Sequence, residues 1–121
     1  MDYTSEVTKE AASAEGVRYT IVRMSFGRRL ELTRRIWELA RRVEYLEAGG
    51  EAREKLEAAV LAGEIDRVYL EWGLVRVEGL NIDGQPATAA TLVEHGPEAL
   101  AREIVGAIKS ECGLSEDERK N

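Results

Sequence analysis

The chain has 121 residues, of which 44% are hydrophobic, and a formal net charge of −6 at neutral pH. This length and composition predict one globular domain with one core, and the acidic balance argues against nucleic acid as the main partner. The single cysteine, Cys112, excludes an internal disulfide, and no stretch approaches the roughly 18 apolar residues that a membrane span needs.

The N-terminal part divides into two segments of different character. Residues 1–16 are polar and acidic and show no hydrophobic period, so they predict a flexible acidic arm ahead of a single globular domain over 17–121. Nothing in residues 1–10 provides the apolar run of a signal peptide. Residues 17–23, V-R-Y-T-I-V-R, alternate between apolar and polar side chains, which is typical of a half-buried strand.

A long helix is predicted over residues 26–48. Ser25 is a favourable N-cap, and Gly49-Gly50 ends the segment. An apolar stripe at helical spacing runs along one side, with Leu30 and Trp37 expected to widen it; the stripe is Leu32, Ile36, Leu39, Val43 and Leu46. Glu31–Arg35 and Glu38–Arg42 are spaced for ion pairs on the opposite side.

A second helix is predicted over residues 51–62, with Gly63 expected to break or bend it before helical spacing resumes over 64–72. Because only Gly49-Gly50 separates the two long helices, they should form an antiparallel hairpin.

The C-terminal half consists of short elements with clear boundaries. Residues 74–77 and the Asp83-Gly84 turn predict a small β-hairpin or a structured loop, and an extension of the preceding helix over 72–77 is the alternative. Thr88 should cap a helix over 89–95, and Pro97 should open another over 97–111. A capping box at Ser115 and Glu118 predicts a last polar turn. The predicted fold is therefore α+β and predominantly helical: one N-terminal strand, a long helix, a helical hairpin, a small β-hairpin and two C-terminal helices.

The sequence offers no constellation of residues for catalysis. His95 is the only histidine, and it is read as a favourable charge near a helix C-terminus. Cys112 falls on the core side of the last long helix, where a cysteine behaves as a small hydrophobic residue. One histidine and one cysteine cannot build a zinc site, and the glycines form no phosphate-binding pattern. We therefore expect no enzyme, no metal and no cofactor.

Charge is distributed unevenly along the chain. Residues 17–48 hold eight arginines and four acidic residues, whereas residues 49–121 hold eight basic and fifteen acidic residues. Paired arginines at 28–29, 34–35 and 41–42 form a strip along the first helix, which suits phosphate binding, a solvated face or a protein-binding ridge. Both tryptophans fall at core spacing, although an exposed one would suit an interface. The candidate partner-binding residues are Arg28, Arg35, Arg42, Trp37 and Trp72.

The segment from Trp72 to Ile104, with its W-G … G-P-E … E-I spacing, and the terminal G-L-S-E-D-E-R-K-N resemble the tail assembly chaperones of long-tailed bacteriophages. The strand followed by M-S-F-G-R-R-L-E-L is similar to the same group, and the resemblance covers residues 17–121. It implies a mostly helical protein of the host bacterial cytoplasm that binds the tape-measure protein and recruits tail-tube subunits. Many proteins of this group are also made in a longer form by ribosomal frameshifting, and the resemblance brings no catalytic residues.

The expected function is therefore contact with other proteins, first as a tail assembly chaperone, with self-association as a further expectation. Two alternatives stay open from the sequence. One is a structural virion protein such as a head–tail adaptor or minor tail protein, and the other is a small nucleic-acid-binding regulator that uses the arginine strip.

Overall fold

The computed structural model describes residues 1–113, and the capping box predicted at Ser115 and Glu118 lies outside them. The fold is α+β and 59% helical, as the sequence predicts. The elements in chain order are β1 (Glu6–Glu10), β2 (Arg18–Val22), α1 (Phe26–Gly49), α2 (Ala52–Gly73), β3 (Leu74–Glu78), β4 (Asn81–Ile82), β5 (Gln85–Pro86), α3 (Ala89–His95) and α4 (Glu98–Glu111).

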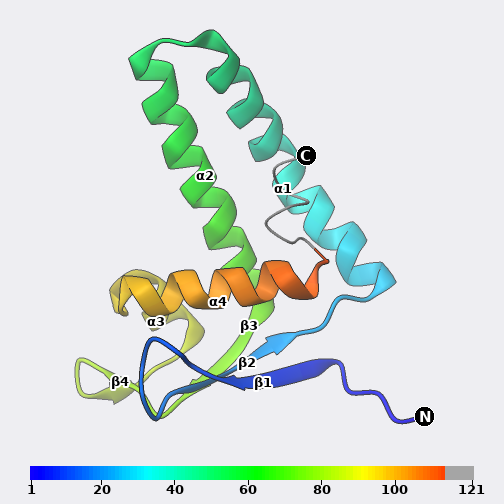
Figure 1. The fold of residues 1–121 in the computed structure, drawn as a ribbon, viewed down its shortest axis with the longest axis vertical. Helices are drawn as coiled ribbons and strands as arrows, with labels where there is room; N and C mark the ends of the chain where they lie inside the picture. Colours follow the sequence, from blue (N-terminus) through cyan, green and yellow to red (C-terminus); the bar gives the residue numbers. More distant parts are fainter. Residues whose placement is uncertain (114–121) are drawn as a thin grey trace.

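Three strands form an antiparallel sheet in the order β1-β2-β3. The two long helices connect β2 to β3, so the sheet closes beneath them and the helical hairpin projects away from it (Figure 1). The predicted strand over 17–23 is confirmed as β2, at the centre of the sheet. Its central position explains why Ile21 is fully buried and Tyr19 nearly so.

The expectation that residues 1–16 form a loose arm is wrong for β1, which pairs with β2 from Glu6 to Glu10. The strand carries one large apolar side chain, Val7, which packs against the core. Its neighbours on the outer side are polar and exposed. An edge strand of this kind is stabilised by backbone pairing with β2 rather than by a hydrophobic pattern of its own.

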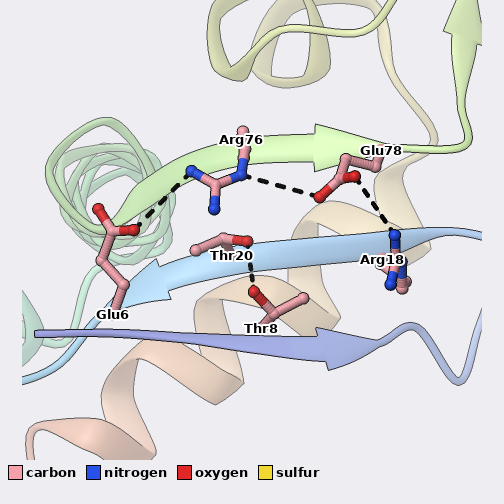
Figure 2. A network of polar contacts seen from close by, with 6 residues as sticks. All are labelled: Glu6, Thr8, Arg18, Thr20, Arg76 and Glu78. Carbon is pink, nitrogen blue, oxygen red and sulfur yellow. Dashed lines mark hydrogen bonds and ion pairs between the residues drawn. The ribbon is translucent and has the colours of Figure 1, made fainter. Parts of the chain in front are cut away.

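The outer face of the sheet carries a chain of charges rather than a second layer (Figure 2). Arg76 on β3 lies 3.8 Å from Glu6 on β1 and 3.7 Å from Glu78, which in turn lies 3.4 Å from Arg18 on β2. Beneath them the hydroxyls of Thr8 and Thr20 share a hydrogen bond of 2.7 Å. Exposed ion pairs of this kind contribute little stability each, and the two positive and two negative charges cancel.

The helical hairpin has the predicted caps. The backbone N–H of Arg28 donates to Ser25 Oγ at 3.2 Å, and Gly50 ends α1 with a φ of 79°. Contrary to expectation, Gly63 neither ends nor interrupts α2, which runs unbroken from Ala52 to Gly73. A glycine inside a helix costs about 1 kcal/mol relative to alanine, and the inward-facing residues on either side of it, such as Ala58 and Tyr69, outweigh that cost.

The core lies where α4 crosses the inner face of the sheet, below the hairpin (Figure 1). The predicted apolar side of α4 is confirmed, because Leu100, Ile104, Ile108 and Cys112 are all buried. The β4–β5 hairpin turns at Asp83 and Gly84, both with positive φ, as its sequence predicts, but residues 74–77, expected to belong to it, instead form β3 and pair with β2. The Thr88 cap is also confirmed: its hydroxyl accepts from Thr91 N–H at 3.1 Å.

Candidate protein-binding surface

Three of the predicted partner-binding residues, Arg28, Arg35 and Arg42, are spaced seven residues apart and therefore lie along one side of α1. The three arginines differ in their exposure and in their contacts. The guanidinium of Arg28 is half-buried and lies 5.7 Å from the centre of the Trp72 ring. Arg35 is exposed and pairs with Glu31 at 3.0 Å, as predicted. Arg42 is exposed and has no ion pair among residues 1–113, so the pair predicted with Glu38 is not formed.

The two tryptophans have opposite surroundings. Trp72, near the end of α2, is 9% exposed and belongs to the core, as expected, so it offers little surface to a partner. Its indole Nε1 is buried without a hydrogen-bond acceptor among the described residues. The core role expected for Trp37 is wrong, since its side chain is 51% exposed and Arg41 lies over its ring at 4.7 Å.

Further exposed apolar residues on the hairpin were not identified from the sequence. Leu30, which was expected to widen the buried stripe of α1, is exposed on the same side as Trp37. On α2, Leu56 and Val60 are also exposed. For Leu30 and Trp37 the sequence holds a signal: at about 100° per residue the two share one side of the helix, well away from the side that carries Leu32, Ile36 and Val43.

Two adjoining hollows lie along α2. One, of about 460 Å³, lies between α2 and the α3–α4 pair, and the other, of about 310 Å³, lies between α2 and the end of α1. They share Ala59 and Ala62, so they form one shallow groove, which we call the alanine groove. Its further apolar lining comes from Gly63, Leu70, Val93, Ala101 and Val105.

Paired charges surround the groove. Arg67 on α2 contacts both Glu71 and Glu94, and Arg102 on α4 pairs with Glu98 at 2.8 Å. Asp66 on its wall accepts from Lys109 Nζ at 2.8 Å, and that ammonium lies 5.2 Å from the Tyr69 ring. Asp66, Arg67, Glu98 and Arg102 are thus paired within the chain, whereas Glu47, Lys55 and Glu64, which also line the groove, have no ion pair among the described residues.

The ionisable groups singled out in the sequence do not converge on this surface. His95 is exposed in the last turn of α3, the position predicted for a charge near a helix end. Cys112 is buried, and burial raises the pKa of its thiol, with Arg29 acting in the opposite direction. Within residues 1–113, no group of three or more His, Cys, Asp or Glu side chains is arranged to hold a metal ion.

No helix within the described part of the chain is long and apolar enough to cross a membrane. Comparisons with known protein families, with curated proteins and with solved structures find no match to this chain.

Proposed function

We propose that this chain is an assembly chaperone of the phage-tail kind, which binds the long helical tape-measure protein and helps recruit tail-tube subunits. The observation that supports this function best is the alanine groove, an open apolar channel beside a projecting helical hairpin. The proposal assigns the protein a role in contact rather than in catalysis.

A helix is the occupant that suits the groove. Amphipathic helices bind grooves between other helices by inserting their apolar side, and small floor residues such as Ala59 and Ala62 let the two backbones approach closely. The wall residues Leu70 and Val105 would contact the inserted side chains. A tape-measure protein presents many turns of such a helix, so several chaperone copies could bind along it.

The mode of binding also suits a chaperone that must later leave its client. The groove is shallow, and four of its charged lining residues, Asp66, Arg67, Glu98 and Arg102, are already paired within the chain. Most of the affinity would therefore come from modest apolar burial at about 25 cal/mol per Å². Such contacts dissociate readily when a tail-tube subunit competes for the client helix.

Co-expression with the tape-measure protein encoded in the same genome tests the proposal. The chaperone should raise the amount of soluble tape-measure protein and co-purify with it. Ala62→Arg, which places a long charged side chain in the groove, should abolish both effects, whereas Ala90→Arg on the exposed side of α3 should change neither. If the wild-type chain has neither effect on this client, the proposal is wrong.

Purified phage particles separate this function from that of a structural virion protein. A chaperone should be missing from mature particles, whereas a head–tail adaptor or minor tail protein should be present at a fixed number of copies. Mass spectrometry of intact particles measures the difference directly.

A further inference from the structure

Large apolar side chains lie exposed on the two outer edges of the hairpin, away from the residues that pack α1 against α2. On α1 these are Leu30 and Trp37, 55% and 51% exposed, and on α2 they are Leu56 and Val60, 71% and 66% exposed. The inward sides of the same helices carry Leu32 and Ala58, both buried. The hairpin therefore has two separate edges that its own chain leaves uncovered.

Each edge combines an apolar line with a line of like charges at the same interval. The α1 edge consists of Leu30, Arg34, Trp37 and Arg41, in which both the apolar pair and the arginine pair are seven residues apart. The α2 edge consists of Leu56, Glu57, Val60, Gly63 and Glu64, with intervals of seven from Leu56 to Gly63 and from Glu57 to Glu64. Because seven residues make about two helical turns, each pair stays on one side of its helix.

The charges on these edges are free to pair with another molecule. Among the described residues, Arg34, Glu57 and Glu64 have no ion pair, and Arg41 contacts the Trp37 ring at 4.7 Å. All four are exposed. One edge is thus basic and apolar and the other acidic and apolar, which is the complementarity that selects partners in helical bundles.

The levels of these residues along the hairpin also match. Trp37 lies twelve residues before the end of α1, and Gly63 lies eleven residues after the start of α2. At ~1.5 Å per residue both lie about 17 Å from the turn. By the same measure Arg34 and Glu64, and likewise Arg41 and Glu57, differ in level by about 4.5 Å, which an arginine side chain can span.

The charged lines fall on matching flanks. Viewed from the N-terminus of each helix, the arginines lie about 40° clockwise of the α1 apolar line, and the glutamates lie about 100° clockwise of the α2 line. The α1 helix of one copy and the α2 helix of a parallel copy would face each other while running in opposite directions. In that arrangement the two clockwise flanks come to the same side of the contact.

Gly63 has no steric purpose within the described chain. A Cβ atom added at this glycine would meet nothing within 4 Å, yet glycine costs about 1 kcal/mol relative to alanine inside a helix. The Trp37 ring of a second copy would explain why glycine stands at position 63, because the bulky ring then packs against backbone that carries no side chain; we call this bare stretch at Gly63 the notch.

We propose that a second copy of this chain docks its α1 edge on the α2 edge of the first, with Trp37 against Gly63 and with Arg34 and Arg41 paired to Glu64 and Glu57. The two edges differ and lie on opposite sides of the hairpin, so the contact is heterologous. Such a contact propagates into a closed ring or an open filament rather than stopping at a dimer.

Charge reversal at one edge at a time tests the contact by sedimentation velocity. The wild-type chain should form assemblies larger than a dimer that weaken as salt is raised. Arg34→Glu/Arg41→Glu and Glu57→Arg/Glu64→Arg should each be monomeric. Their equimolar mixture should assemble again in alternating copies, because the two unchanged edges are complementary and so are the two reversed edges, and the quadruple variant should assemble through reversed charges alone.

The matched control is Arg35→Glu/Arg42→Glu, which makes the same change in net charge on another flank of α1 and should leave assembly unchanged. Gly63→Leu, which fills the notch without a charge change, should reduce assembly while the helical content measured by circular dichroism is retained. A wild-type chain that remains monomeric at its highest soluble concentration overturns the proposal, as does an equimolar mixture of the two double variants that remains monomeric.

This inference does not depend on the proposed client. Gly63 and Glu64 of the α2 edge also line the alanine groove, but Arg34 and Arg41 do not. Monomeric Arg34→Glu/Arg41→Glu that still binds a tape-measure protein would therefore show that client binding does not require self-association. If the chain self-assembles but does not bind the tape-measure protein, only the chaperone proposal is wrong.

Discussion

Glu103 on α4 binds Ser13 through both of that residue's donors: the backbone N–H lies 2.9 Å and the hydroxyl 2.6 Å from Glu103 Oε1. The other carboxylate oxygen accepts from the backbone N–H of Ala12 at 2.8 Å. One side chain thereby attaches the loop between β1 and β2 to the helix that covers the sheet, across 90 residues of sequence.

This attachment should depend on pH. Burial opposes ionisation of Glu103, but hydrogen bonds from Ser13, Ala12 and Tyr19 favour the carboxylate more strongly, so its pKa lies below the ordinary value. A carboxyl group with a lowered folded-state pKa contributes stability that is present above its unfolded pKa of about 4.3 and is lost as the pH falls through the folded value. Glu103→Gln should therefore cost about 1 kcal/mol at neutral pH, and the difference from wild type should shrink below about pH 4.

Urea unfolding at a series of pH values measures this difference. Glu98→Gln is the matched control, since Glu98 lies on the same helix and pairs only with the exposed Arg102; its cost should stay within about 0.5 kcal/mol. A Glu103→Gln cost that stays constant down to pH 3 would contradict the role assigned to the carboxylate.

Gly79 and Gly84 form a natural pair for separating backbone strain from steric overlap. Both have positive φ, 83° and 82°, but a Cβ at Gly79 would overlap the carbonyl oxygen of Gly16, whereas a Cβ at Gly84 would meet nothing within 4 Å. Gly84→Ala should cost about 1 kcal/mol for the left-handed conformation alone. Gly79→Ala should cost about 2–4 kcal/mol, because the end of β3 must also move away from the turn before β2.

Thermal or urea unfolding of the two variants gives the comparison. Equal costs for the two substitutions would mean that the approach of Gly79 to Gly16 is not a fixed feature of the fold.

The parts of the fold that the sequence predicts are those with local causes. Ser25, Gly50 and Thr88 mark helix boundaries through contacts within a few residues. The strand β1 lacks such a signal, because its pairing with β2 and its attachment through Glu103 are non-local.

The candidate surface shows the same division. The helical spacing of apolar residues locates an apolar side of α1 but does not fix its width. The same spacing therefore predicts a core position for Trp37, which is exposed in the structure. The alanine groove could not be predicted at all, since its walls come from α2, α3 and α4 and exist only once these helices pack. Arg42 was singled out in the sequence, whereas the better-placed Arg34 and Arg41 become apparent only beside the exposed Leu30 and Trp37.

The contrast between the tryptophans gives a spectroscopic prediction. In Trp72→Phe the remaining Trp37 should emit at the long wavelength of a solvated indole and be quenched readily by acrylamide, whereas in Trp37→Phe the buried Trp72 should emit at shorter wavelength and resist quenching. Trp72→Phe removes an N–H that has no acceptor among residues 1–113, so its cost should be limited to packing, about 1–2 kcal/mol.

Self-association adds a concentration dependence to this signal. If Trp37 docks against Gly63 of a neighbour, its emission in Trp72→Phe should shift to shorter wavelength as protein concentration rises, and Glu57→Arg/Glu64→Arg added to that variant should remove the shift. Separately, ready quenching of Trp72 by acrylamide in Trp37→Phe would contradict the burial of Trp72.

The buried thiol of Cys112 reports opening at the end of α4. Arg29 on α1 donates from Nη2 to the carbonyl of Cys112 at 3.1 Å, which holds the end of α4 against the hairpin. Loss of a hydrogen bond worth about 1 kcal/mol should increase the open population about fivefold. Arg29→Ala should therefore accelerate labelling of Cys112 by a neutral maleimide under native conditions. Faster labelling could not come from the change in charge, because removing the Arg29 charge raises the pKa of the Cys112 thiol further and would by itself slow the reaction. Arg35→Ala, which breaks only an exposed pair with Glu31, should leave the labelling rate unchanged, and equal rates for the two variants would contradict the assigned contact.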